Sequence, residues 1–134
     1  MNVLVLANRN LEGLEEICRA AGLTHSQYVA LWVLCLTDDV DAGLPMGELA
    51  DGLLNRAADT TRLVDRMVKA GLVERLPNPA DRRGVLVRAT DAGRDAFARV
   101  TPDLQAFHRS QWSNLSAAEL GELDRLLRKV LWQE

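Results

Sequence analysis

The chain has 134 residues, 48% of them hydrophobic, with 16 basic and 19 acidic side chains and a formal net charge of −3. This length predicts one domain with a real core, and no apolar run approaches the roughly 18 residues of a transmembrane helix. The apolar run at residues 3–7 is too short for a signal peptide, so we expect a cytoplasmic protein. Cys18 and Cys35 have no metal-type spacing, which indicates reduced packing thiols.

Charge is unevenly distributed along the chain. Residues 1–54 carry two basic and eight acidic side chains, whereas residues 55–99 carry ten basic and six acidic ones, a balance of +4. Residues 100–134 carry four basic and five acidic groups. Because phosphate binding depends on local charge, the middle segment favours a nucleic-acid partner despite the negative total.

A narrow apolar stripe, with alternating steps of four and three residues, predicts a first helix that ends at Gly22. Such a stripe needs another helix to cover it, either from the same chain or from a partner subunit. The stripe consists of Ala7, Leu11, Leu14, Cys18 and Ala21.

The residues Thr24-His-Ser-Gln27 form a capping box that begins a second helix. This helix is strongly apolar, so we expect it at the centre of the core. His25, Tyr28 and Trp32 recur on one side of it at steps of three and four. They either pack in the core or line a small-molecule pocket.

An acidic loop follows at residues 38–43, with three carboxylates in four residues. Clustered carboxylates suggest calcium, yet no glycine-centred loop of about twelve ligand-bearing residues follows. We therefore expect a solvated loop, with no metal site and no cofactor.

Two helices are then expected, at residues 45–53 and 56–70, joined by a brief connection. This arrangement is typical of a helix-turn-helix, in which the second helix contacts the bases. The second helix has one apolar and one polar side. The apolar side carries Thr60, Leu63, Val64 and Met67, and the polar side carries Ala58, Thr61, Arg62, Asp65 and Lys69.

Residues 72–76 and 85–89 are two β-prone runs that flank a loop with turn residues at both ends and Arg82 and Arg83 near its tip. A polar-faced helix followed by a basic hairpin is typical of a winged helix. The helix would lie in the DNA major groove while the loop reaches the minor groove. The other interpretation is a surface helix and hairpin with ordinary salt bridges.

Two long helices are expected after the hairpin. Thr90 can cap the first, in which Pro102 should produce a kink. Ser116-Ala-Ala-Glu119 is a capping box for the second, whose leucines and valine repeat at helical spacing. Together with the first helix they exceed what a small winged helix requires, which suggests a dimerisation bundle.

From about residue 23 to residue 131 the chain resembles the multiple-antibiotic-resistance (MarR) family of bacterial winged-helix regulators. The most specific segment is Asp81-Arg-Arg-Gly-Val-Leu-Val-Arg-Ala-Thr-Asp-Ala-Gly93, which matches the family's wing and the start of the following helix. Thr24-His-Ser-Gln-Tyr28 and Thr61-Arg-Leu-Val-Asp-Arg66 also fit. The resemblance implies one mainly α-helical domain with a small β-hairpin wing over residues 1–134. It further implies a winged helix-turn-helix lobe at 45–90 and a helical dimerisation region at 1–22 and 91–134.

The resemblance also implies the roles of individual residues. Arg83 would enter the minor groove, braced by a salt bridge from Asp81. Leu54 departs from the family pattern, and so does Arg56-Ala-Ala-Asp59, which stands where the family usually has serines and threonines. Asp59 would be repelled by phosphate unless it accepts from a cytosine amino group or pairs with Arg62. The expected DNA contacts are Arg56, Ala58, Thr61, Arg62, Arg66, Lys69, Arg82 and Arg83.

The function expected on this basis is a homodimeric, sequence-specific DNA-binding transcriptional regulator. It would be a repressor, released from a pseudo-palindromic operator by a small aromatic or phenolic effector. The expected pocket residues are Arg19, His25, Tyr28, Trp32, His108 and Trp112, with an arginine serving as the cation for a carboxylate or phenolate.

Three alternatives come from other classes. Two histidines, no HExxH motif and no glycine-rich phosphate loop argue against an enzyme. A winged-helix dimer could act as a protein-interaction module without DNA, although the basic wing tip argues against this. A thiol-based redox sensor is the third, but no nearby base obviously lowers the pKa of Cys18.

Overall fold

The computed structural model describes residues 1–53 and 55–132, which form six helices and three short strands. The order is α1 (Asn2–Ala20), α2 (His25–Cys35), β1 (Leu44–Pro45), α3 (Met46–Leu53), α4 (Ala57–Lys69), β2 (Val73–Pro77), β3 (Val85–Ala89), α5 (Asp91–Gln111) and α6 (Ala117–Trp132). This confirms the expected fold class, a mainly α-helical chain with a small β-hairpin. Leu54, named above as a departure from the family, lies outside the described residues.

The hairpin of β2 and β3 is antiparallel, with Val73 opposite Ala89 and Pro77 opposite Val85. A third strand, β1, pairs with the other edge of β3, so the sheet order is β1-β3-β2. We had expected Pro45 to begin a helix, but it ends this strand and α3 begins at Met46. The residue before a proline is disfavoured in helical backbone, which explains why Leu44 is extended.

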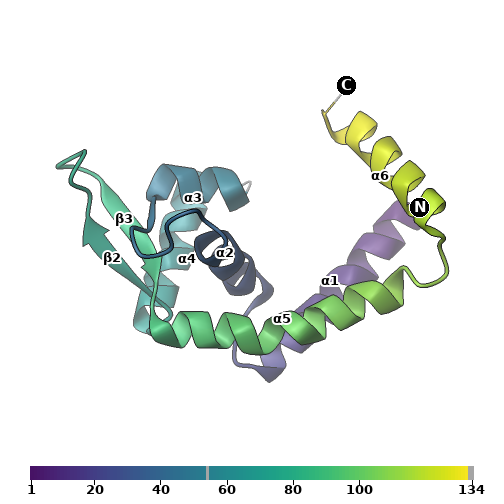
Figure 1. Cartoon of the computed structure of the whole chain (residues 1–134), viewed down its shortest axis with the longest axis horizontal. Coiled ribbons are helices and arrows are strands. Elements are labelled where there is room, and N and C mark those ends of the chain that lie inside the picture. Colours follow the sequence, from purple (N-terminus) through teal and green to yellow (C-terminus); the bar gives the residue numbers. More distant parts are fainter. Residues whose placement is uncertain (54, 133–134) are drawn as a thin grey trace.

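The core lies where α2, α4 and the sheet meet, to one side of α5 (Figure 1). Leu31 and Leu34 of α2 are buried there, which confirms α2 as a central core helix. The apolar side of α4 is buried as its periodicity predicted, including Met67 and Val64 at 0% exposure. The hydroxyl of Thr60 on that side is also buried and has no hydrogen-bond partner among the described residues. Burial of one side of α4 leaves its polar side facing outward.

The turn from the hairpin into α5 is fixed by a threonine and a glycine. The Thr90 hydroxyl donates to the carbonyl of Gly71 at 2.6 Å and accepts from the backbone N–H of Gly93 at 3.1 Å, which caps α5 as predicted. A Cβ placed on Gly93 would overlap the carbonyl oxygen of Leu72. The glycine therefore allows α5 to pack directly on the backbone that leads into β2.

Gly93→Ala is accordingly expected to lower the free energy of unfolding by about 1–3 kcal/mol, the usual cost of overpacking a tight contact. Urea unfolding followed by circular dichroism would measure the change. Gly47→Ala is the matched control, because a Cβ at Gly47 meets nothing within 4 Å. Equal stability of Gly93→Ala and the parent protein would contradict the close packing described above.

Helices α1, α5 and α6 form an arm that extends away from a lobe composed of α2, α3, α4 and the three-stranded sheet (Figure 1). α5 is continuous through Pro102 and bends near its middle, as Pro102 led us to expect. α1 packs closely on α5 at Gly13. The ring of Phe107 on α5 occupies the space that a Cβ at this position would need. The arm is thus tied to the lobe through α5 and through the end of α1.

Much of the arm's apolar surface is uncovered. No residue in the described part of α6 is buried, and Val130 and Leu131 are 77% and 68% exposed. In the first half of α1, Val3 and Leu4 are 69% and 67% exposed.

No helix in residues 1–53 or 55–132 combines the length and the apolar character needed to cross a membrane.

Candidate functional site

The outward side of α4 carries a row of polar side chains. All the residues predicted to contact DNA from this helix and its N-cap are exposed, namely Arg56, Ala58, Thr61, Arg62, Arg66 and Lys69. The Thr61 hydroxyl donates to the carbonyl of Ala57 at 3.0 Å, so its oxygen remains free to accept. One side of the helix therefore offers mainly cationic groups to solvent.

Two acidic residues on this side have partners within the chain. Asp59 Oδ1 lies 4.0 Å from Nη1 of Arg62, which is the pairing considered above as relief for its charge. Asp65 is bound by Arg75 of β2, an ion pair between the helix and the hairpin that the sequence analysis did not anticipate. Both pairs reduce the negative charge that a phosphate would meet on this surface.

The wing loop, residues 78–84, is ordered by its own side chains. Asp81 Oδ1 accepts from the backbone N–H of Arg83 at 2.9 Å, and the Asp81 carbonyl accepts from Gly84 N–H at 3.0 Å. The Asn78 side chain accepts from Ala80 N–H at 3.0 Å. These turns present Arg82 and Arg83 as exposed side chains at the loop's far end.

The expected salt bridge between Asp81 and the guanidinium of Arg83 is absent from the described residues, so that detail was wrong. The carboxylate instead holds the backbone amide two residues later, the local contact that aspartate commonly makes in turns. Such a contact costs little entropy because both groups belong to the same short loop. Asp81 therefore orients the backbone at Arg83 and leaves its guanidinium free.

α4 and the wing face a common hollow of about 430 Å³. Thr61 of α4, Arg75 of β2 and Arg83 of the wing line it together with the N-terminal end of α3. The full lining is Pro45, Met46, Gly47, Thr61, Arg75, Asn78, Asp81, Arg83, Gly84 and Val85. The structure thus brings one predicted contact of the helix, Thr61, and one of the wing, Arg83, to the same hollow, whereas Arg62 and Arg66 line a separate hollow near Asn55.

Two other basic residues of the middle segment have structural roles. Arg88 Nε donates to Glu74 at 2.8 Å and Arg88 Nη1 donates to the carbonyl of Asp41 at 2.9 Å. Arg94 Nη2 donates to the Asp41 carboxylate at 2.8 Å, and this hydrogen bond holds the pKa of Asp41 below its ordinary value. These contacts attach the acidic loop to the sheet and to α5, so Arg88 and Arg94 are engaged in contacts within the chain.

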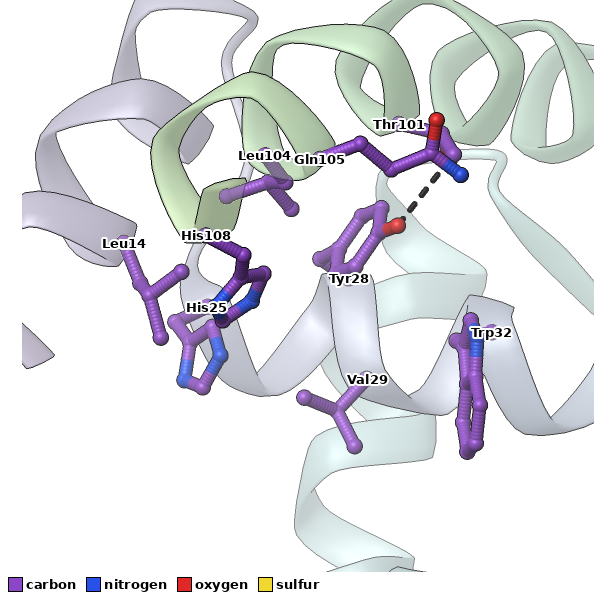
Figure 2. A pocket seen from close by; sticks show the side chains of 9 residues that line it. All are labelled: Leu14, His25, Tyr28, Val29, Trp32, Thr101, Leu104, Gln105 and His108. Atoms are coloured by element: carbon purple, nitrogen blue, oxygen red, sulfur yellow. Dashed lines mark hydrogen bonds between the residues drawn. The ribbon is translucent and has the colours of Figure 1, made fainter. Parts of the chain in front are cut away.

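A cavity of about 400 Å³ lies between α2 and α5, where the lobe meets the arm (Figure 2). Four of the predicted pocket residues line it: His25, Tyr28, Trp32 and His108. The lining also includes Leu14, Val29, Thr101, Leu104 and Gln105, which the sequence analysis missed. The periodicity of α2 predicted most of the residues that this helix contributes to the cavity. Of the lining residues on α5 only His108 was predicted, and Thr101, Leu104 and Gln105 had no sequence signal that placed them toward α2.

Arg19 and Trp112, which we predicted in the same pocket, do not line it. Arg19 follows the buried Cys18 by one residue, which turns its side chain about 100° around the helix toward solvent. Trp112 is the C-cap of α5, one helical turn beyond His108, and lies past the last α5 residue that lines the cavity. The cavity therefore lacks the arginine that we had expected to supply a positive charge.

The polar groups on the α5 wall form an ordered chain. Thr101 Oγ1 donates to the carbonyl of Phe97 at 2.7 Å and lies 3.0 Å from Tyr28 Oη. The Tyr28 ring stacks on Phe97 with a centroid separation of 5.4 Å. Both contacts hold Tyr28 rigidly at the wall of the cavity (Figure 2).

Burial lowers the pKa of His25 below its ordinary value of 6.5, Glu15 opposes this shift and His108 adds to it. A lowered pKa means that the unfolded chain binds a proton more readily than the folded one. Stability is therefore present above about pH 6.5 and is lost as the pH falls from there toward the folded-state pKa.

We expect the melting temperature to decrease between about pH 7 and pH 5.5, with a smaller decrease in His25→Gln. Thermal unfolding by circular dichroism at stepped pH would measure both. Asp41 has a lowered pKa and titrates below this window, so it does not contribute to the difference. Identical pH profiles for the two proteins would show that His25 is not buried in its neutral form.

The cysteines are poorly suited to redox chemistry. Cys18 is fully buried, and burial together with the charge of Glu15 raises its pKa. Burial also raises the pKa of Cys35, although Arg94 opposes the shift. A raised pKa disfavours the reactive thiolate, which supports packing roles for both cysteines.

Within residues 1–53 and 55–132, His, Cys, Asp and Glu side chains form no group of three that could hold a metal ion.

Comparisons with known proteins agree with this geometry. A family model described as "MarR family" matches residues 21–84. Over 73 residues the chain is 48% identical to the multiple antibiotic resistance protein MarR of Escherichia coli, and this match covers 53% of this chain and 50% of that protein. The aligned part thus spans about half the length of the first curated relatives that the chain matches.

Longer matches extend over most of the chain. The chain is 31% identical over 116 residues to the uncharacterized HTH-type transcriptional regulator YsmB of Bacillus subtilis, and this match covers 86% of this chain and 76% of that one. The crystal structure of a mutant E. coli MarR complexed with operator DNA has a TM-score of 0.85 and 32% identity, with 96% of this chain and 90% of that chain covered.

Proposed function

Because the chain belongs to the MarR family, a family of winged-helix transcriptional regulators, we propose that it is a homodimeric, sequence-specific DNA-binding repressor without enzymatic activity. The single observation that supports this most directly is the shared orientation of α4 and the wing around one hollow. Thr61 and Arg83 both line that hollow, and Arg62, Arg66 and Arg82 are exposed on the same two elements. A mutant E. coli MarR of similar structure is complexed with operator DNA.

The dimensions of the two DNA grooves suggest different contacts for α4 and for the wing. α4 is narrow enough for the major groove, where Thr61 and Arg62 would meet base edges and Arg66 and Lys69 would meet phosphates. The wing would place Arg83 in the adjacent minor groove, whose negative potential attracts a guanidinium. This role places the protein in the cytoplasm, where bacterial DNA lies.

Homodimerisation is proposed because the arm's apolar surface has nothing to cover it within the described chain. A second copy related by a two-fold axis would bury α1 and α6 of both copies. Two lobes held in this way would bind a pseudo-palindromic operator with half-sites about one helical turn apart.

Release by a small aromatic effector is proposed from the position of the cavity between α2 and α5. A ligand that fits one spacing of the two lobes better than another shifts the population toward that spacing. Because the cavity joins a lobe helix to an arm helix, a ligand there can alter how the lobes are held relative to the arm.

Selection of bound sequences from random duplex DNA tests this proposal directly. Fluorescence anisotropy with a selected duplex at two salt concentrations should show tight binding that weakens with salt. Sedimentation should give a dimer at micromolar concentration. A dimer that selects no sequence and binds no duplex would be a protein-interaction module instead.

A further inference from the structure

Two hydroxyl groups line the cavity between α2 and α5, and the hydrogen atoms of both are already used in hydrogen bonds within the chain. Thr101 has one hydroxyl hydrogen, which it donates to the Phe97 carbonyl at 2.7 Å. The contact of 3.0 Å between Tyr28 Oη and Thr101 Oγ1 must therefore use the Tyr28 hydrogen, with Thr101 as acceptor. Toward a ligand, both hydroxyl oxygens offer lone pairs and no hydrogen (Figure 2).

The cavity also lacks a permanently charged cationic side chain. Among the residues that line it there is no lysine and no arginine. Burial lowers the pKa of His25, so this imidazole is neutral at pH 7. Glu15 is close enough to act on His25 electrostatically and brings negative charge to the same end. A carboxylate in the cavity would lose part of its hydration without gaining a lysine or arginine partner.

The remaining lining is suited to a flat apolar body. Leu14, Val29, Leu104 and the indole of Trp32 provide apolar walls around a volume of about 400 Å³. This is within the usual range for small-molecule sites, roughly 300–1,000 Å³. The Gln105 amide and the neutral imidazole of His25 add groups that donate or accept without carrying charge.

From these observations we propose that the cavity selects uncharged aromatic compounds that carry a hydrogen-bond donor, such as primary carboxamides, and discriminates against aromatic carboxylates. The ligand's N–H donates to Tyr28 Oη while its ring lies against the apolar walls. This inference rests on the proposed function for its biological meaning, because it names the chemical class of the effector. It replaces our expectation of a carboxylate or phenolate held by an arginine.

Three probes of nearly equal shape distinguish the effect of the ligand's charge from the effect of its hydrogen-bond donor. Benzamide is neutral and donates, methyl benzoate is neutral and does not donate, and benzoate is ionised at neutral pH. Each is titrated into full-length protein at pH 7.5 while the Trp32 indole N–H is followed by NMR, with its signal assigned from Trp32→Phe. Benzamide is expected to bind about tenfold more tightly than either of the others, the usual effect of one hydrogen bond.

Two variants test the hydroxyl chain itself. In Thr101→Val the Tyr28 hydrogen loses its acceptor and becomes free to donate, so methyl benzoate and benzoate should gain affinity severalfold. Tyr28→Phe removes the hydroxyl altogether, so benzamide should weaken while methyl benzoate is unchanged. Retained NMR chemical-shift dispersion in both variants shows that the fold is intact.

Benzoate binding as tightly as benzamide, or no probe shifting the Trp32 signal, would overturn the inference. Unchanged affinities of methyl benzoate and benzoate in Thr101→Val would do the same. DNA binding is measured separately by anisotropy with no probe present. A protein that prefers benzamide but binds no duplex would refute the proposed function alone, and one that binds duplex but none of the probes would refute this inference alone.

Discussion

Arg83→Ala is expected to weaken binding to a selected operator by about 10- to 100-fold, corresponding to roughly 1–3 kcal/mol for one specific arginine contact. The fold should be unaffected, because Arg83 is exposed and forms no ion pair among the described residues. Its backbone N–H would still donate to Asp81, so the loop keeps its turn. Anisotropy with the selected duplex measures the loss, and circular dichroism checks the fold.

The control for this variant removes the same charge elsewhere. Arg99 is exposed on α5, away from α4 and the wing, and Arg99→Ala should bind the operator like the parent protein. Asp81→Ala should weaken binding less than Arg83→Ala, because Asp81 acts through the loop backbone. If Arg83→Ala bound the operator as tightly as Arg99→Ala, the assignment of the wing to the minor groove would be wrong.

Periodicity and capping signals were sufficient to predict the buried side of α4 and the start of α5. The apolar spacing of Leu63, Val64 and Met67 predicts which side of α4 is buried, and the burial of all three confirms it. Thr90 predicts the start of α5, and its hydroxyl caps that helix. These features are local, because each depends on residues within one or two turns of each other.

Contacts between distant segments could not be predicted in the same way. Neither the pairing of Asp65 with Arg75 nor that of Asp41 with Arg94 has a sequence signature, because each depends on how separate elements pack. The cavity shows the same division. Helical spacing on α2 placed Tyr28 at its wall, but the arginine predicted there belongs to a different side of α1.

The second large effect is expected from Leu131→Glu, a substitution in α6 of the arm that should weaken the proposed dimer. Leu131 is 68% exposed, so a charge there should leave the isolated chain stable. In a symmetric dimer the change enters the interface twice. Losing the burial of two leucines costs about 3–6 kcal/mol, which raises the dimer dissociation constant by roughly 10²- to 10⁴-fold. Sedimentation should therefore show monomer at micromolar concentration.

Loss of the dimer should also remove most of the DNA affinity, because the second lobe then binds without the effective concentration that the dimer provides. Operator binding by Leu131→Glu should fall by about 100-fold or more, although α4 and the wing are unchanged. Asn114→Glu is the matched control, since it adds the same charge to an exposed polar position between α5 and α6. A Leu131→Glu protein that sediments as a dimer would show that α6 does not form the subunit interface, and the apolar start of α1 would then be the segment to test.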